Sequence, residues 1–168
     1  SQAKRVTVPV VRIRDQATVD ALLAFSNDVH ALSDITFLSD DVQVLSYARK
    51  QIPAIRTAMD FSASSLANDT ASLLKISGDT NRAGAKIALL PAALTTRGFV
   101  SRLQRLLITV WTHAEAANAV QAAQLLGTGV NGVVSRDVSH YSEVLVKLPA
   151  NTLLRKPLVI GHRGMPSR

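Results

Sequence analysis

Cysteine is absent from all 168 residues of the sequence. The chain therefore forms no disulfide, holds no thiolate-bound metal and has no cysteine nucleophile, and its redox compartment stays open. No apolar run reaches the roughly 18 residues needed to cross a membrane, and the N-terminal Ser1-Gln2-Ala3-Lys4-Arg5 lacks the apolar centre of a signal peptide. These absences do not fix a location, since the sequence could come from a longer membrane-anchored or secreted parent.

Aromatic residues are also scarce, at 4% of the chain, although hydrophobic residues make up 47%. The length is that of one ordinary domain, and this hydrophobic content is ample for a buried core. That core must be built from Ala, Val, Leu and Ile, which suits helices packed on buried strands. The composition therefore favours the α/β class.

Acidic residues are few: 12 Asp and Glu stand against 19 Lys and Arg, which gives a net charge of +7. Such a balance raises the question of a nucleic acid or an anionic membrane as partner. The basic residues are scattered, without interleaved aromatics or a nucleic-acid motif. We therefore expect a solvated basic surface and no nucleic-acid partner. An extracytoplasmic or membrane-associated parent would explain the same charge.

Short apolar runs alternate with segments of helical periodicity along most of the chain. Strands are expected at 6–13, 34–39, 54–61, 86–91, 107–112 and 130–137, and helices at 17–29, 42–50, 95–106 and 114–126. Polar residues follow the carboxyl ends of several strands. This pattern predicts a parallel sheet or part of a (β/α) TIM-type barrel, with functional groups gathered at one edge.

The predicted domain organisation has a barrel-like α/β domain over 1–150. Its segment 62–85 has weak helical spacing and a turn-rich end, so we interpret it as an insertion. Residues 151–168 are interpreted as a linker and the first strand of a following domain.

Several of these segments resemble the glycerophosphodiester phosphodiesterase family. The run 158–164, Leu-Val-Ile-Gly-His-Arg-Gly, is similar to the first barrel strand of that family and its His-Arg-Gly turn. Segment 37–41 resembles a family strand ending in Ser-Phe-Asp, and 107–112 one ending in Trp-Thr. Segment 129–137 resembles the closing Gly-Val-Asp-Gly-Ile-Ile-Thr-Asp strand. The order of the pieces, spaced by suitable helices, makes the resemblance specific.

The resemblance implies a parent hydrolase of lipid metabolism that cleaves glycerophosphodiesters to glycerol 3-phosphate and an alcohol, using calcium or magnesium. Expelling an alkoxide requires a proton donor, and cationic groups offset the charge that grows in the transition state. By resemblance, His162 and Arg163 would be the catalytic residues if a barrel were completed around them.

The sequence departs from the family where the metal should bind. The segment Val11-Arg12-Ile13-Arg14 corresponds to a family Glu-Ile-Lys strand, so that Arg12 replaces a metal-binding Glu. The family's Pro-Glu-Asn-Thr segment, carboxylate pair and second histidine have no counterpart after Gly164. We therefore expect a degenerate, non-catalytic barrel portion without a metal or other cofactor of its own.

Other polar residues are weaker candidates. Trp111, at a strand end, is expected either in the core or at a pocket mouth, and His113 in a surface turn. His30 and His140 lack a ligand at suitable spacing, and Asp40-Asp41 suits a helix N-terminus better than a cation site. The sequence has no Gly-x-Ser-x-Gly elbow and no P-loop.

The leading hypothesis is thus a non-catalytic portion of a phosphodiesterase-family protein, with the neighbouring catalytic domain of the same parent as its partner. The alternative is a binding or assembly module that pairs through open strand edges, including with copies of itself. A third hypothesis is a degenerate barrel that binds an anionic glycan or lipid head group through Arg12, Arg14 and Arg136, with these residues and Trp111 lining the pocket.

Overall fold

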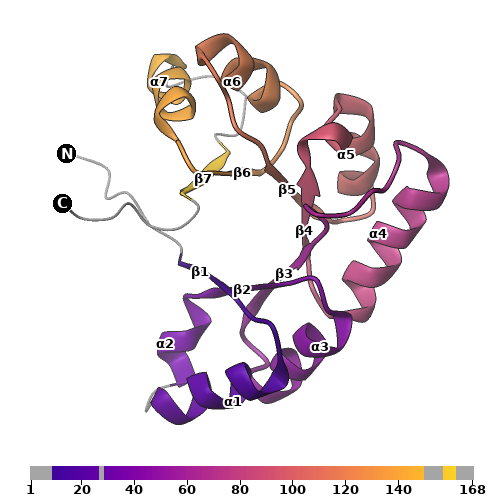
Figure 1. Cartoon of the computed structure of the whole chain (residues 1–168), viewed down its shortest axis with the longest axis vertical. Helices are drawn as coiled ribbons and strands as arrows, with labels where there is room; N and C mark the ends of the chain where they lie inside the picture. Colours follow the sequence, from indigo (N-terminus) through magenta and orange to yellow (C-terminus); the bar gives the residue numbers. More distant parts are fainter. Residues whose placement is uncertain (1–8, 27–28, 150–156, 162–168) are drawn as a thin grey trace. The chain divides into compact units, whose positions relative to one another are not determined.

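The structure, a computed structural model, describes residues 9–26, 29–149 and 157–161. The chain divides into two compact units: Ser1–Asp60 with Gly78–Lys86, and Phe61–Ser77 with Ile87–Arg168. Both units alternate strands with helices (Figure 1). No helix in the described part of the chain is long and apolar enough to cross a membrane.

The first unit holds three parallel strands in chain order, β1 (Val10–Arg12), β2 (Thr36–Ser39) and β3 (Arg56–Asp60). Helices α1 (Gln16–Phe25) and α2 (Val29–Ser33) connect β1 to β2, and α3 (Val42–Gln51) connects β2 to β3. All four residues of β2 are buried, which is typical of a parallel strand covered on both faces.

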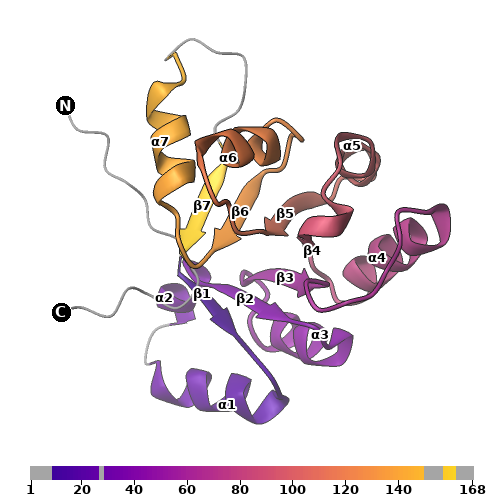
Figure 2. The same cartoon turned by 45° about the horizontal axis from the view of Figure 1, so that its top comes forward.

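The second unit holds four parallel strands, again in chain order. They are β4 (Ile87–Pro91), β5 (Thr109–His113), β6 (Gly132–Ser135) and β7 (Leu158–Gly161), and Figure 2 shows β5, β6 and β7 side by side. The connecting helices are a short 3₁₀ turn (Ala92–Leu94) followed by α5 (Arg97–Arg105), then α6 (Ala119–Leu126) and α7 (Ser139–Lys147). Helix α4 (Thr70–Arg82) lies between β3 and β4 in sequence.

Polar side chains fix where the helices begin. The carboxylate of Asp41 accepts hydrogen bonds from the backbone N–H groups of Gln43 (2.7 Å) and Val44 (3.4 Å). Asp15, Thr96 and Asn118 cap α1, α5 and α6 in the same way. These side chains satisfy N–H groups that have no partner inside the helix. The interpretation of Asp41 as a helix cap is confirmed.

The α/β class with parallel strands of a partial barrel is confirmed, and a strand lies within or overlaps each of the six expected ranges; residues 6–8 of the first range lie outside the described residues. The segment 62–85, predicted to be an insertion, holds α4. Helix α7 was missed from the sequence. The strand expected near 158–161 is β7, which pairs in parallel with β6; its assignment to a following domain stays a prediction, as do the other domain boundaries.

Candidate functional site

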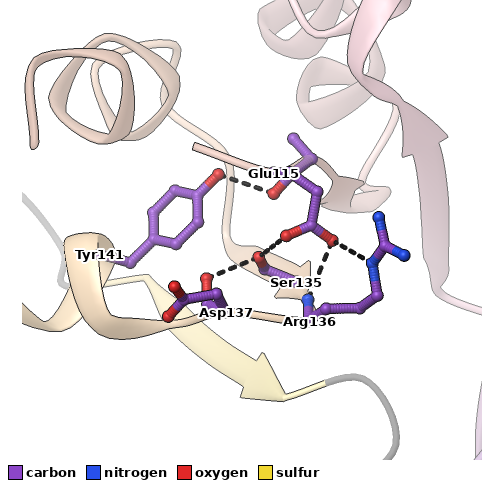
Figure 3. Close-up of polar contacts among 6 residues, drawn as sticks. Glu115, Ser135, Arg136, Asp137 and Tyr141 are labelled. Carbon is purple, nitrogen blue, oxygen red and sulfur yellow. Dashed lines mark hydrogen bonds and ion pairs between the residues drawn. The ribbon is translucent and has the colours of Figure 1, made fainter. Parts of the chain in front are cut away.

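The carboxyl ends of β5 and β6 carry a cluster of polar groups in the second unit. Glu115 lies two residues beyond β5, and Ser135 is the last residue of β6. Because the strands are parallel and adjacent, their polar exits meet at the same edge of the sheet. Figure 3 shows the Glu115 carboxylate pointing toward Ser135 and Arg136.

The Glu115 carboxylate binds both sides of the β6 exit. One oxygen accepts a hydrogen bond from the Ser135 hydroxyl at 2.7 Å. The other accepts one from the backbone N–H of Arg136 at 2.9 Å and lies 3.4 Å from the guanidinium Nε of the same residue. The Ser135 hydroxyl also lies 2.7 Å from the carbonyl of Asp137. Glu115 thus holds the turn after β6 through backbone and side chain together.

These contacts set the charge of Glu115. Burial by itself would raise the pKa of this carboxyl, but hydrogen bonds from the Ser135 hydroxyl, from the backbone of Arg136 and Asp137 and from the Arg136 side chain lower it overall. Glu115 is therefore ionised at neutral pH. A carboxylate that already accepts this many hydrogen bonds is a poor general base, so its geometry suits positioning of Arg136 better than proton transfer.

Tyr141 fastens α7 to the same loop. Its side chain is fully buried, and its hydroxyl donates a 2.7 Å hydrogen bond to the carbonyl of Ala114, next to Glu115. Burial, with a smaller effect of the Glu115 charge, raises the pKa of Tyr141 to about 12. The carboxylate of Asp137 accepts a 2.9 Å hydrogen bond from the backbone N–H of Ser139 at the start of α7. Together these contacts fix the chain between β6 and α7.

A second polar contact lies at the strand ends of the first unit. The guanidinium of Arg12, the last residue of β1, lies 2.6 Å from the carboxylate of Asp60, the last residue of β3. The Asp60 side chain is 4% exposed and that of Arg12 is 42% exposed. The cation thus offsets the cost of burying the carboxylate.

The other predicted site residues belong to two different units. Arg14 is exposed two residues beyond β1, whereas Arg136 is exposed at the β6 exit of the second unit. Trp111 is 3% exposed, with its ring against Gly132 of the neighbouring strand. His113, at the end of β5, is half-buried. His162 and Arg163 lie outside the described residues, and the catalytic and pocket-lining assignments stay predictions.

The described residues do not fit a divalent metal at either strand edge. Nowhere in 9–26, 29–149 or 157–161 do three His, Cys, Asp or Glu side chains gather closely enough to hold a cation. Asp60, which could supply a carboxylate ligand, faces a guanidinium instead. We therefore derive no metal-dependent step from these residues.

Sequence reasoning missed Glu115 and Asp60. Asp60 had a usable signal, because it is a charged residue at the carboxyl end of a strand. The sequence signal for Glu115 was weaker, because this residue lies two positions past a strand, in an alanine-rich segment that was expected to be helical.

Comparison with solved structures finds proteins with a similar fold. A protein from Silicibacter pomeroyi DSS-3 described as a glycerophosphoryl diester phosphodiesterase matches 76% of the chain with a TM-score of 0.59 and 18% identity. The glycerophosphodiester phosphodiesterase from Agrobacterium tumefaciens C58 matches 80% with a TM-score of 0.58 and 13% identity. The fold resembles that of glycerophosphodiester phosphodiesterases. The resemblance expected from the sequence is thus confirmed at the level of fold.

A similar fold is found in a further solved structure. A mandelate racemase/muconate lactonizing protein from Paracoccus denitrificans PD1222, complexed with magnesium, matches 96% of the chain with a TM-score of 0.55 and 14% identity. The chain spans 43%, 54% and 49% of the lengths of these three neighbours. No protein-family profile matches the sequence, and no curated protein sequence matches it significantly. Fold alone leaves function to be argued from the residues.

Proposed function

We propose that this chain is a non-catalytic, barrel-type portion of a protein related to the glycerophosphodiester phosphodiesterases. Its parent would hydrolyse glycerophosphodiesters to glycerol 3-phosphate and an alcohol with a divalent metal, through a neighbouring catalytic domain. The fold resemblance supports the relationship. The role of this portion is then structural support of that domain.

The observation that carries the non-catalytic part is the ion pair of Arg12 with Asp60. Arg12 stands where the family resemblance puts a metal-binding Glu. A guanidinium 2.6 Å from the Asp60 carboxylate neutralises that ligand and repels a second cation at the same place. The negative charge of Asp60 at the strand ends of the first unit is thus balanced by Arg12 of the same chain.

Activity of the purified chain tests this proposal directly. The chain is incubated with glycerophosphocholine and either calcium or magnesium, and released glycerol 3-phosphate is measured. We expect no release above that of a sample without protein. Release that disappears in a His162→Ala variant would overturn the proposal, because the activity would then belong to this chain and not to a contaminant.

A second candidate function is assembly through a strand edge, favoured by the position of β7. Within the described residues β7 pairs on one side only, with β6, and its residues Leu158, Val159 and Ile160 are half-buried. The N–H of Leu158 donates to the carbonyl of Asn131 on the β6 side at 2.9 Å. Since successive N–H groups of a strand point to opposite sides, the N–H of Val159 faces the outer edge.

That alternation gives a selective test. Val159→Pro removes an N–H from the outer edge, whereas Ile160→Pro removes one from the β6 side. If the edge pairs with a second copy, light scattering will detect a dimer for the natural chain and a folded monomer for Val159→Pro, and Ile160→Pro will lose stability. A natural chain that stays monomeric at high concentration contradicts self-assembly.

A further inference from the structure

A basic and apolar face lies on α5 and the first half of α4, both in the second unit. The guanidinium of Arg102 on α5 lies 3.3 Å from the hydroxyl of Thr70 at the start of α4, which joins the two helices directly. Figures 1 and 2 both show these helices as neighbours. The face is defined as the exposed residues around this Arg102–Thr70 contact.

Three large apolar side chains on this face are exposed to solvent. Leu74 is 63% exposed, Leu106 46% and Leu107 89%. Leu74 lies four residues after Thr70 and Leu106 four residues after Arg102, so each is one helical turn beyond the contact. Because α4 and α5 lead into the parallel strands β4 and β5, the two helices run in the same direction, and Leu74 and Leu106 each lie one turn further along from the Arg102–Thr70 contact.

The backbone fixes Leu107 in its exposed position. Leu107 has a φ of 63°, and the N–H groups of Leu107 and Ile108 donate to the carbonyls of Gln104 (3.0 Å) and Leu103 (3.2 Å). This is the Schellman arrangement that ends helices, usually with glycine at the left-handed position. Leu103 and Ile108 are buried, whereas Leu106 and Leu107, which lie between them in the sequence, are exposed.

The charge beside Leu106 and Leu107 is mainly basic. Residues 92–114, which include α5, hold three Arg and no Asp or Glu, whereas Asp69 is exposed next to Thr70 at the start of α4. Arg97, Arg102 and Arg105 all lie on α5 and are exposed. Arginines beside projecting leucines match the chemistry of an anionic lipid surface, where the leucines enter the acyl region and the arginines meet the head groups. A purely acidic protein surface would match the arginines but would leave the leucines exposed to water.

We propose that this face, made of Leu74, Arg102, Arg105, Leu106 and Leu107, binds the surface of anionic membranes. The proposal does not depend on the function proposed above. It gives a role to exposed leucines and to a charge imbalance that the fold does not need.

Vesicle binding of the whole 168-residue chain tests the proposal. Co-sedimentation is measured with phosphatidylcholine vesicles that contain phosphatidylglycerol and with pure phosphatidylcholine vesicles. We expect binding to the anionic vesicles that weakens with added salt, and little binding to the neutral ones. Replacing both Arg102 and Arg105 with Gln should lower the partition coefficient roughly fivefold for each arginine.

Matched variants distinguish binding through this face from a general effect of the positive net charge. Lys50→Gln with Arg56→Gln removes the same charge from exposed positions of the first unit and should leave most binding intact. Leu106→Ser with Leu107→Asn should weaken binding to anionic vesicles without unfolding the chain, because Asn tolerates the left-handed conformation. Val146→Ser, on an exposed residue of α7, is the matched apolar control.

Three results overturn the proposal. The first is equal binding to neutral and anionic vesicles, or none to either. The second is a control pair that loses as much binding as the α5 pair. The third is a concentration-dependent dimer that the Leu106 and Leu107 variants abolish, which would mean that a second copy of the chain covers this face.

Discussion

Among the described glycines, Gly132 has the least room for a side chain, because it lies against the ring of Trp111. A Cβ atom added to Gly132 would lie 2.7 Å from Cδ1 and 2.9 Å from Nε1 of the Trp111 ring. The ring is buried between strands and has little room to move. We predict that Gly132→Ala lowers the free energy of unfolding by about 1–3 kcal/mol, measured by urea denaturation followed through tryptophan fluorescence.

Gly98 supplies the matched control for that substitution. It lies in α5, and an added Cβ atom would meet nothing within 4 Å. Gly98→Ala should therefore raise the free energy of unfolding by about 0.5–1 kcal/mol, because alanine is the better helix former. If both substitutions have the same sign, packing against Trp111 is not the reason for glycine at 132.

Leu107 carries a conformational cost that a substitution can remove. Its φ of 63° is unfavourable for a residue with a Cβ atom, and its side chain is 89% exposed, so that little burial is lost on replacement. We predict that Leu107→Gly stabilises the chain by about 0.5–1 kcal/mol in thermal denaturation. Leu106→Gly is the comparison: with a φ of −86° at that position, glycine should destabilise by a similar amount.

At the scale of elements, the strands and their order were predictable because parallel strands buried on both faces form short apolar runs. The cap of α3 was predictable because Asp41 precedes a periodic segment. Helix α7 was not predicted: its N-cap position, Val138, makes no side-chain capping bond, and the sequence pattern assigns Asp137, which accepts from the backbone N–H of Ser139, to the polar end of the preceding strand. The Glu115 cluster was missed because its bonds to Ser135 and Arg136 join residues about 20 positions apart, which local patterns do not encode.

Glu115 should make the β6–α7 connection sensitive to pH. Its pKa is lower in the folded chain than in the unfolded one, so its stabilising effect is fully present above the ordinary glutamate pKa of about 4.3 and is lost as the pH falls through the folded value. We predict that Glu115→Gln costs about 1 kcal/mol at neutral pH. The difference from the natural chain should shrink in urea denaturation at lower pH.

Glu143→Gln is the control for this pH series. Glu143 accepts a 2.6 Å hydrogen bond from Lys147 one turn along α7, but both side chains are largely exposed. Exposed pairs of this kind contribute little to stability. If Glu143→Gln changes the unfolding free energy as much as Glu115→Gln does, the network around Ser135 and Arg136 has no special role.

At the scale of the whole molecule, the fold class followed from the sequence but the chemistry did not. The alternation of strands and helices is enough to predict parallel α/β architecture, and the order of family-like segments pointed to the phosphodiesterase barrels. The substitution of Arg12 was visible in the sequence as well. Its partner Asp60 was not, because the two residues are 48 positions apart in sequence and meet only when β1 and β3 flank β2.

The Arg12–Asp60 pair decides whether this fold can hold a metal in its first unit, and Arg12→Glu tests that. The substitution leaves the buried Asp60 beside a second carboxylate, so we expect a loss of about 2 kcal/mol and a melting temperature lower by about 4–8 °C. Two carboxylates are also ligands for calcium. Added calcium should therefore recover part of the lost melting temperature in Arg12→Glu and leave the melting temperature of the natural chain unchanged.

Arg14→Glu makes the same charge change at an exposed position and should show neither effect. If calcium raised the melting temperature of the natural chain, the proposal that Arg12 keeps a cation away from Asp60 would be contradicted.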